Sequence, residues 1–565
     1  MTGAEPREDG NRTGPRPLVW LIFLGGMVFS AALSLWFGRN VTFTGDELAM
    51  LSLVAELQPG ELFEPYVGHL VPVAFLAYKA LLETVGTSNY YFFQMMALGS
   101  IFLMGAGVLY WGSRRVPDWV ALAPSLVLIL FTGDLLHYVA GNGFTIIFAL
   151  ACGVWALNAW ERDTRWGDVA ALVLLAIGMM TYTVGVAFAV GLVVAAVVGD
   201  RRRVWVAGAP LLAYALWRVL VASSSAEVED VGPDWVNIFL LPAWSFQAIG
   251  GVLESLVGVG FNFNIKEGLD ESIFTGNLAP VLAVVFLGLI LWRLREGGIP
   301  KTFWTVAAIA VAMFTSQVLV WGSFEARAEP LEPRYLYPGA LVVILMGIEL
   351  VRGVEWDRIK LAILWLATAV AIASAIGALI NSVVRFEVGT NMSRAQATAA
   401  YILQTTPNPP PVSEQARSTI RRSFDPVATR GFPSFSFDES KLDEIEPRYS
   451  KEVDSFLAES LQLGLKPIEP GVATGPCRPA VAGPGPSGRA TVPSGGAILE
   501  SARDLELRLG RYGRNASWPL GPLWADRPAQ LFIPTDAGTR PWFVQVDASS
   551  AGELRDLVIC RPSRD

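Results

Sequence analysis

Residues 18–37 read LVWLIFLGGMVFSAALSLWF, an apolar run that contains no charged side chain. An α-helix rises 1.5 Å per residue, so a run of this length crosses roughly 30 Å of hydrocarbon. The run is too long for the apolar core of a cleavable signal peptide, and further apolar runs follow it. It therefore predicts a membrane-spanning first helix and a fold that is decided in the bilayer.

The composition of the whole chain agrees with a membrane protein. Of its 565 residues, 52% are hydrophobic and 17% are charged, and the mean hydropathy is +0.43. A soluble domain carries about 25% charged residues. The net charge of −8 gives no reason to expect a nucleic-acid partner. The abundance of Ala, Gly, Val and Arg is typical of a high-GC bacterium, so we expect the inner membrane of a bacterial cell.

Eleven apolar segments are predicted to span the membrane. They are residues 18–37, 90–111, 117–132, 144–160, 168–183, 184–199, 204–222, 278–293, 302–322, 335–352 and 359–381. The stretch 168–199 is divided into two short spans that meet near Thr181–Thr183. The stretch Trp235–Phe261 is apolar but contains Pro242 and several glycines. We expect it to lie in the membrane interface or to re-enter, because one more span would invert the charge pattern that follows.

Basic residues assign the two sides of the membrane. Five short connections all contain Arg or Lys: residues 113–117, 161–168, 200–203, 293–301 and 351–360. The connection Gly133–Gly143, on the other side, contains neither. Because Lys and Arg concentrate in cytoplasmic loops, the N-terminus is predicted to be cytoplasmic. The long loop 38–89 and the region after residue 381 are then extracytoplasmic.

The chain is thus divided into a cytoplasmic tail (1–17), a transmembrane domain (18–381) and an extracytoplasmic C-terminal domain (382–565). The last has an ordinary domain size. Helical patterns at 392–404 and 441–465 precede short alternating runs at 505–509, 542–546 and 554–559, which are typical of strands. The predicted fold class is a polytopic α-helical membrane protein with a C-terminal α+β domain that contains a small β-sandwich.

Two of the three cysteines, Cys477 and Cys560, lie in this C-terminal domain. Such a pair stays reduced in the cytoplasm and is able to form a disulfide outside it. By the chain-entropy model, the closure contributes roughly 4–5 kcal/mol. The third, Cys152, lies inside an apolar run and is interpreted as a small core residue.

The first outer loop carries the residues with the clearest chemistry. Directly after the first span, residues 43–50 read FTGDELAM, which places the adjacent carboxylates of Asp46 and Glu47 at the membrane surface. Two amphipathic stretches follow, Glu47–Leu57 and Leu70–Val85. Neither fits as a span without spoiling the charge pattern, so both are predicted to be interfacial helices.

This layout resembles the membrane-embedded glycosyltransferases of the GT-C class, which include protein O-mannosyltransferases and aminoarabinose transferases. The resemblance covers the predicted spans. It extends to Glu332–Pro338, EPRYLYP, because an Arg-Tyr pair at the outer mouth of a late span is a common feature of the class. It implies an enzyme that transfers a sugar from a polyprenyl-phosphate donor to an extracytoplasmic glycan, lipid or protein of the cell envelope.

General chemistry agrees with the roles that the resemblance implies. Transfer to a hydroxyl needs a general base, a role that we assign to Asp46, with Glu47 as the neighbouring candidate. If attack occurs opposite the leaving phosphate, the reaction inverts the anomeric centre. Cations must stabilise the phosphate as it leaves, and arginine is suited to this by its planar fork of donors.

Several residues are therefore candidates for donor and substrate binding. Candidates for the donor phosphate are Arg334, Tyr335 and Arg218, with Lys79 and Arg327 as weaker ones. Candidates for substrate contact are His69, Asp134 and His137. Neither histidine is part of a metal-binding motif, and the chemistry requires no cofactor, although a divalent cation held by Asp46 or Glu47 is compatible with it.

Plainer interpretations stand beside these. Asp46 is also suited to be the N-cap of the helix that follows, and Glu47 to complement the start of that helix. Arg334, Tyr335 and Arg218 also fit interfacial anchors, since Arg snorkels and Tyr belongs to the aromatic belt. At the level of the whole chain, the alternatives are a lipid or solute transporter or flippase, and a non-catalytic scaffold that anchors the C-terminal domain.

Overall fold

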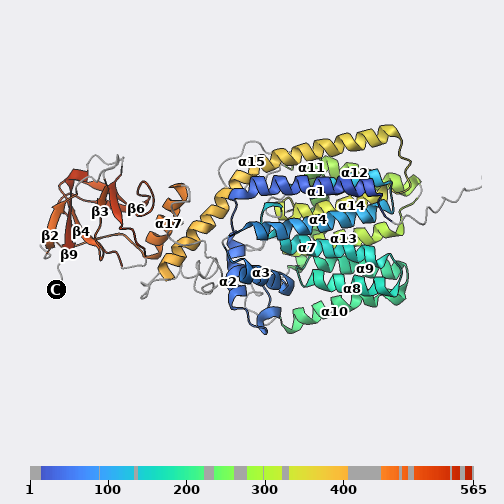
Figure 1. The fold of residues 1–565 in the computed structure, drawn as a ribbon, viewed down its shortest axis with the longest axis horizontal. Coiled ribbons are helices and arrows are strands. Elements are labelled where there is room, and N and C mark those ends of the chain that lie inside the picture. Colours follow the sequence, from blue (N-terminus) through green and yellow to red (C-terminus); the bar gives the residue numbers. More distant parts are fainter. Residues whose placement is uncertain are drawn as a thin grey trace, which may run out of the picture. The chain divides into compact units, whose positions relative to one another are not determined.

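A computed structural model (Figure 1) describes residues 14–87, 89–132, 138–221, 234–259, 276–296, 298–320, 330–404, 447–469, 474–480, 489–534, 538–547 and 554–562. The chain divides into two compact units. The first contains the residues up to Val41, Leu57–Tyr78 and Tyr90–Glu387. The second contains Thr42–Glu56, Lys79–Asn89 and the residues from Val388 onward.

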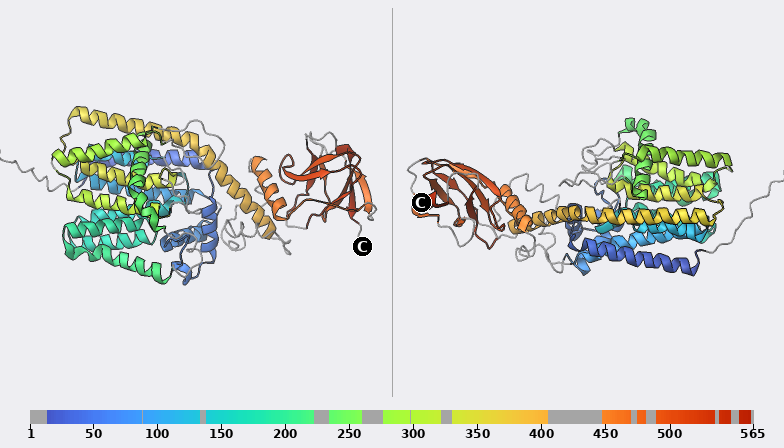
Figure 2. Two further views of the ribbon diagram at one scale, coloured as in Figure 1. Left: turned by 180° about the vertical axis from the view of Figure 1, so that it is seen from behind. Right: turned by 90° about the horizontal axis from the view of Figure 1, so that it is seen from above.

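The first unit is a bundle of apolar helices. Its helices are α1 (Pro17–Phe37), α4 (Tyr91–Ser113), α5 (Asp118–Ile129), α7 (Gly143–Trp160), α8 (Arg165–Met179), α9 (Gly185–Val198), α10 (Trp205–Leu220), α11 (Leu241–Val257), α12 (Ala279–Glu296), α13 (Lys301–Leu319), α14 (Pro333–Leu350) and the first part of α15 (Arg358–Gln404). Short 3₁₀ turns are η1 (Gly38–Asn40), η2 (Glu61–Phe63), η3 (Arg201–Arg203) and η6 (Trp235–Leu240). The axes of most of these helices are roughly parallel to one another, so that the helices lie side by side (Figures 1 and 2).

A helix is present at each of the eleven predicted positions, but the number of spans is not confirmed. By length and composition, six of the described helical segments are able to cross a membrane: Pro17–Asn40, Tyr91–Ser113, Gly143–Trp160, Trp235–Val257, Lys301–Leu319 and Arg358–Leu403. Helices such as α5 (12 residues) and α9 (14 residues) are shorter than the roughly 20 residues of a typical span. The predicted break near Thr181–Thr183 is confirmed, since α8 ends at Met179 and α9 begins at Gly185.

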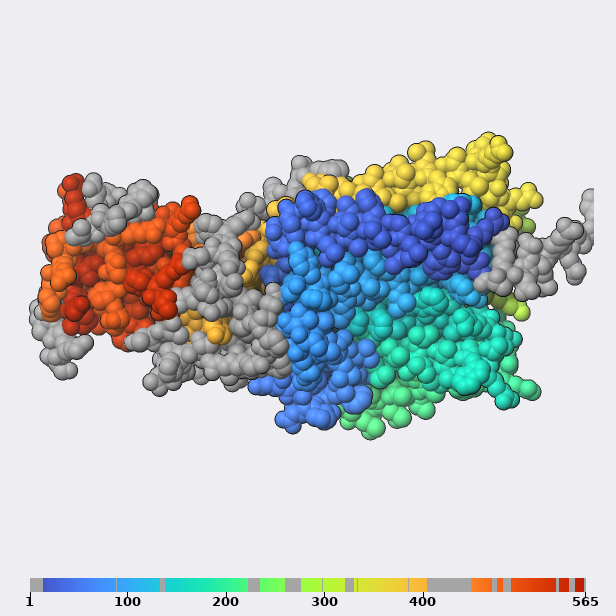
Figure 3. Space-filling view, viewed as in Figure 1, coloured from blue at the N-terminus to red at the C-terminus, as the bar shows by residue number. Residues whose placement is uncertain are grey.

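The apolar surface of the bundle indicates a membrane protein. Figure 3 shows α1, in dark blue, on the surface of this unit. Its outward side chains are large and apolar, with Leu21 65% and Val28 72% exposed. The first turns of α15 present Ile359 and Leu366 in the same way. Contiguous apolar surface of this kind is unfavourable in water and is expected where lipid covers the helices.

The five connections predicted to be cytoplasmic gather at one end of the bundle, here called the basic end. Arg115, after α4, bonds to Glu161 after α7 and to Glu349 in the last turn of α14. Arg203, in η3, bonds to Asp168 in the first turn of α8. Arg293, in the last turn of α12, donates a hydrogen bond to the carbonyl of Arg352, after α14. The backbone N–H of Arg16, just before α1, donates to Asp118 at the start of α5.

The helix α11 lies by the opposite end of the bundle. The neighbours of α11 are Gln317 in the last turn of α13, Ala279 at the start of α12 and Gly339 in the second turn of α14. Gly258, directly after α11, packs against Ser374. That residue is 16 positions into α15, so at 1.5 Å per residue it lies about 24 Å from the start of that helix. Together with η6, α11 forms Trp235–Val257, one of the six segments able to cross a membrane, so the prediction of an interfacial or re-entrant segment stays a prediction.

The second unit contains a β-sandwich. One antiparallel sheet has the order β1-β7-β4-β9-β2, and the other has the order β3-β8-β5-β6. The strands are β1 (Leu465–Pro467), β2 (Thr474–Pro479), β3 (Arg489–Thr491), β4 (Ala497–Ser501), β5 (Leu505–Gly510), β6 (Trp518–Leu523), β7 (Ala529–Leu531), β8 (Phe543–Val546) and β9 (Leu557–Pro562). Leu499 and Leu557 of the first sheet and Leu507 and Val544 of the second share one buried core. The alternation of Leu505–Leu509 thus folds as predicted, with Leu505, Leu507 and Leu509 inward.

The helix α17 (Pro447–Ser460) packs on this sandwich through one buried carboxylate. Asp454 accepts hydrogen bonds from the backbone N–H groups of Arg511, Tyr512 and Gly513 at 2.8–3.0 Å. The helix is shorter than the predicted 441–465, of which residues 441–446 lie outside the described part of the chain. The last predicted span, 359–381, and the predicted helical pattern at 392–404 both lie in α15, which is one helix of 47 residues.

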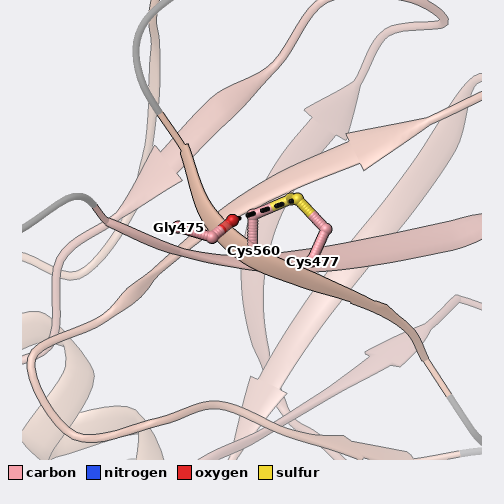
Figure 4. Close-up of a disulfide and its surroundings, with 3 residues drawn as sticks. All are labelled: Gly475, Cys477 and Cys560. Carbon is pink, nitrogen blue, oxygen red and sulfur yellow. Dashed lines mark hydrogen bonds between the residues drawn. A yellow bond between two sulfur atoms is a disulfide. The ribbon is translucent and has the colours of Figure 1, made fainter.

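A disulfide joins Cys477 of β2 to Cys560 of β9 (Figure 4). The two residues are directly opposite in the antiparallel pair, which brings the side chains together. Cys560 is fully buried. The bond therefore ties an edge strand of the first sheet to its neighbour. Cys152, as expected, is buried in α7 and free.

Candidate functional site

The site is built around a tight turn in the first outer loop, Tyr66–His69. The backbone N–H of each of these two residues donates to the carbonyl of the other, at 2.9 and 3.0 Å. Both central residues, Val67 and Gly68, have positive φ angles of 48° and 74°. A two-residue turn of this type requires them, and glycine satisfies the requirement at little cost. For the β-branched Val67 the conformation is strained, so the surrounding contacts must hold the turn in place.

Three contacts hold this loop on the ends of the bundle helices. The indole N–H of Trp217, near the end of α10, donates to the carbonyl of Phe63 at 2.7 Å. The neighbouring Arg218 donates to the carbonyl of Gly68 at 3.3 Å. The backbone N–H of Val73 donates to the carbonyl of Met180, at the end of α8. The loop is thereby fixed at the end of the bundle that is opposite the basic end.

The imidazole of His69 is held between α8 and α9. Its Nδ1 lies 2.7 Å from the Oγ1 of Thr183. Its ring lies on the ring of Tyr182, with centroids 4.3 Å apart and planes inclined by 34°. Thr183 Oγ1 is in turn 3.4 Å from the hydroxyl of Tyr214 on α10. The break between α8 and α9 therefore supplies the residues that orient this histidine.

The electrostatic setting of His69 is strongly positive. The pKa of His69 is lowered from 6.5 to about 4, chiefly by burial and further by the positive charges of Arg218 and Arg334. A neutral imidazole is therefore the stable form at neutral pH. Arg218, at the end of α10, and Arg334, at the start of α14, were both predicted to bind the donor phosphate. Both charges act on His69.

Arg334 and Tyr335 open α14, and Arg334 has an acidic neighbour. The guanidinium of Arg334 forms an ion pair with Glu332, with Nε–Oε1 at 3.0 Å and Nη2–Oε2 at 3.1 Å. It also lies over the ring of Tyr335, 5.1 Å from the centroid. A carboxylate that accepts both bonds of the planar fork fixes the direction of the guanidinium. Glu332 therefore positions Arg334.

The two carboxylates of FTGDELAM lie in the second unit and have different surroundings. The helix α2 (Gly45–Glu56) is capped by Thr44 and Glu47: the backbone N–H of Thr44 donates to Glu47 at 2.9 Å, and that of Glu47 donates to Thr44 Oγ1 at 3.2 Å. This is a capping box. Glu47 is fully buried, whereas Asp46 is exposed in the first turn. The N-cap of α2 is therefore Thr44 and not Asp46.

Lys79 also lies in the second unit, on α3 (Pro72–Thr84), and it contacts α2. Its Nζ donates to the carbonyl of Val54 at 3.0 Å and pairs with Glu83 at 3.5 Å. A cation at the C-terminal carbonyls of a helix stabilises the helix end. This position gives Lys79 a structural role within the pair of helices.

Three candidates, Arg327, Asp134 and His137, lie outside the described residues. Within the part of the chain that the structure describes, no three His, Cys, Asp or Glu side chains come close enough together to hold a metal ion.

Thr183, Tyr214, Tyr182 and Trp217 complete the site, and none of them was predicted from the sequence to belong to it. Hydroxyl and indole groups inside apolar helices rarely stand out, because Thr, Tyr and Trp are ordinary residues of membrane helices. The one available indication was the break between α8 and α9, where a polar Thr-Tyr-Thr sequence interrupts two apolar runs.

Comparisons with known proteins give remote structural likenesses, of which two are as follows. One is to the crystal structure of the Archaeoglobus fulgidus oligosaccharyltransferase in complex with Zn and sulfate, at 14% identity and a TM-score of 0.36. The other is to the archaeal oligosaccharyltransferase AglB from Archaeoglobus fulgidus in complex with an inhibitory peptide and a dolichol-phosphate, at 13% identity and a TM-score of 0.35. The alignments cover 73% and 74% of this chain but 58% and 62% of the two solved chains.

Likenesses at these identities and TM-scores carry no conclusion about fold or function. No protein-family model matches the chain, and no curated protein matches it. The function is therefore argued from the residues of the site.

Proposed function

We propose that this chain is an integral-membrane glycosyltransferase that uses a polyprenyl-phosphate-linked sugar and acts on an extracytoplasmic acceptor of the cell envelope. The observation that supports the proposal best is the cluster of Arg218, Arg334 and His69 at the end of the bundle that is opposite the basic end. Two arginines and a neutral imidazole offer hydrogen-bond donors to an anion. A lipid phosphate, anchored by its polyprenyl chain in the bilayer, presents such an anion at the membrane surface.

In the proposed reaction, an acceptor hydroxyl attacks the anomeric carbon of the sugar. Asp46 takes the proton of the hydroxyl, the new glycosidic C–O bond forms, and the bond from the anomeric carbon to the phosphate oxygen breaks. The electron pair leaves on the phosphate, whose growing charge is stabilised by Arg334 and Arg218. Attack from the face opposite the phosphate inverts the anomeric centre.

The assignment of the base to Asp46 rests on its contrast with Glu47. Glu47 is buried and occupied by the capping box of α2, whereas Asp46 is exposed on the same turn. The N-terminus of a helix favours the ionised form of a carboxylate, which is the form that a general base needs. Glu47 then has the role of fixing the start of α2, so that the neighbouring carboxylate is held on a rigid element.

The test is a transfer assay with the full chain in lipid nanodiscs. Radiolabelled polyprenyl-phosphate sugars are supplied one by one, with an envelope extract as acceptor. We expect label to move to the acceptor with the wild type and to fall at least 100-fold with Arg334→Ala. Arg202→Ala is the matched control, because Arg202 is exposed in η3 at the basic end, and it should transfer normally. A folded wild-type protein that transfers none of the sugars, but moves a labelled lipid across vesicles, would refute the proposal in favour of a flippase.

A further inference from the structure

A line of three polar groups runs from α10 through the α8–α9 break to His69. The hydroxyl of Tyr214 lies 3.4 Å from Thr183 Oγ1, which lies 2.7 Å from His69 Nδ1. Tyr182 covers one face of the imidazole, and the ring of Tyr214 packs on Trp217 with centroids 5.4 Å apart. The three groups come from different parts of the bundle and meet at the turn that Arg218 also holds.

The directions of the hydrogen bonds follow from the donors that are available. Within the described residues, Thr183 is the hydrogen-bond partner of the Tyr214 hydroxyl. A phenol is more acidic than an aliphatic alcohol and is the better donor, so Tyr214 donates to Thr183. The single proton of Thr183 is then directed to Nδ1 of His69. A neutral imidazole that accepts at Nδ1 carries its proton on Nε2.

We propose that Tyr214 and Thr183 are positioning residues that hold His69 as the neutral tautomer protonated on Nε2, which then donates a hydrogen bond to the phosphate of the lipid-linked donor. This inference rests on the proposed function and adds to it the state of the imidazole and the residues that set it. Thr183 and Tyr214 act through His69 and do not themselves touch the donor.

A neutral donor is suited to a position between two cations. A third positive charge beside Arg218 and Arg334 is costly to bury, whereas a neutral N–H adds a hydrogen bond without that repulsion. Among the described residues, the groups that act on the imidazole are Arg218 from α10, Arg334 from α14, and Tyr182 and Thr183 from the α8–α9 break, with Tyr214 bonded to Thr183. None of these supplies a negative charge at neutral pH, so nothing among them favours the imidazolium.

The first test reads the tautomer directly by ¹⁵N NMR of histidine-labelled full chain in lipid. The chain has two histidines, so the His69 resonances are those that disappear in His69→Gln. We expect a neutral ring with the proton on Nε2, unchanged from pH 8 to pH 5, and a shift of the Nε2 resonance when a polyprenyl phosphate is added. A proton on Nδ1, a titration near pH 6.5 or an Nε2 resonance indifferent to the lipid phosphate would overturn the inference.

The second test separates a positioning role from a packing role. Thr183→Val keeps the shape of the side chain and removes its hydroxyl, whereas Thr183→Ser keeps the hydroxyl. We expect Thr183→Val to lower transfer about 5- to 10-fold, chiefly by raising the KM for the donor, and Thr183→Ser to retain most of the wild-type activity. Equal losses in the two variants would mean that only packing matters, and would contradict the inference.

The two proposals fail in different ways. If the wild type transfers no sugar but His69 has the expected tautomer and responds to polyprenyl phosphate, the proposed function fails and the phosphate-binding role of His69 stands. If the wild type transfers sugar but His69 is protonated on Nδ1, the function stands and the positioning role of Thr183 and Tyr214 fails.

Discussion

Substituting Asp46 and Glu47 one at a time is the most informative perturbation, because the two adjacent carboxylates have separate roles. Asp46→Asn changes an exposed side chain in the first turn of α2. The loss of a favourable charge at a helix N-terminus costs about 0.3–1 kcal/mol of stability. The loss of a general base lowers the rate about 10²- to 10⁴-fold. We therefore expect Asp46→Asn to fold normally and to transfer almost no sugar.

Substitutions of the neighbouring Glu47 are expected to affect stability and not the chemical step. Glu47→Ala removes the acceptor of the Thr44 N–H and leaves that half-buried donor without this bond. The cost is about 1–3 kcal/mol of stability. Glu47→Gln keeps an oxygen that is able to complete the capping box, so we expect it to stay within about 1 kcal/mol of the wild type and to remain active.

The assay measures thermal unfolding in detergent and sugar transfer in lipid for the three variants side by side. The reasoning predicts that Asp46→Asn loses activity alone, Glu47→Ala loses stability first, and Glu47→Gln loses little of either. An active Asp46→Asn together with an inactive, stable Glu47→Gln would reverse the two roles and refute the assignment.

Three further predictions concern stability. The pKa of His69 is about 4 in the folded protein and 6.5 when unfolded, so the unfolded chain binds more protons between these values and stability falls as the pH drops through this window. In pH-dependent unfolding from pH 8 to pH 5, the wild type should lose up to about 2 kcal/mol more stability than His69→Gln, and equal losses would contradict this. Arg115→Met should destabilise the protein by about 3–5 kcal/mol, because the fully buried Glu349 loses its Arg115 partner. In thermal unfolding, the double variant with Glu349→Leu should recover part of that lost stability. Cys477→Ser should lower the unfolding free energy of the C-terminal domain by about 4–5 kcal/mol, since the disulfide closes a loop of 83 residues, and a reductant should have no further effect on this variant.

The positions of the bundle helices were predictable because apolar length and basic connections act independently and agree. The connections with Arg115, Arg203 and Arg293 were assigned to one side by composition, and ion pairs and a hydrogen bond of the structure bring them to one end. The number of spans was less predictable, because several apolar helices, such as α5 and α9, are shorter than a typical span, whereas Trp235–Val257 is long enough to cross.

The chemistry of the site was predictable only in part. Arg218 was found because an arginine in an apolar run is conspicuous, Arg334 through the resemblance of EPRYLYP, and His69 as a polar residue of the first outer loop. Thr183 and Tyr214 were missed, because a hydroxyl in a membrane helix is common and its partner depends on a tertiary contact. The alternative that Asp46 is the N-cap of α2 is wrong by two residues for a local reason: the capping box pairs Thr44 with Glu47, and both Thr44 and Asp46 are good capping residues.

The measurement that tests the central claim most directly is a single-turnover experiment in lipid nanodiscs. The full chain receives a polyprenyl-phosphate sugar labelled in both the sugar and the phosphate, together with an envelope acceptor. The account predicts that one polyprenyl phosphate is released for each sugar that appears on the acceptor, and that Asp46→Asn and Arg334→Ala abolish both together. Sugar and phosphate that remain joined, while the lipid moves between leaflets in wild type and variants alike, would contradict the account.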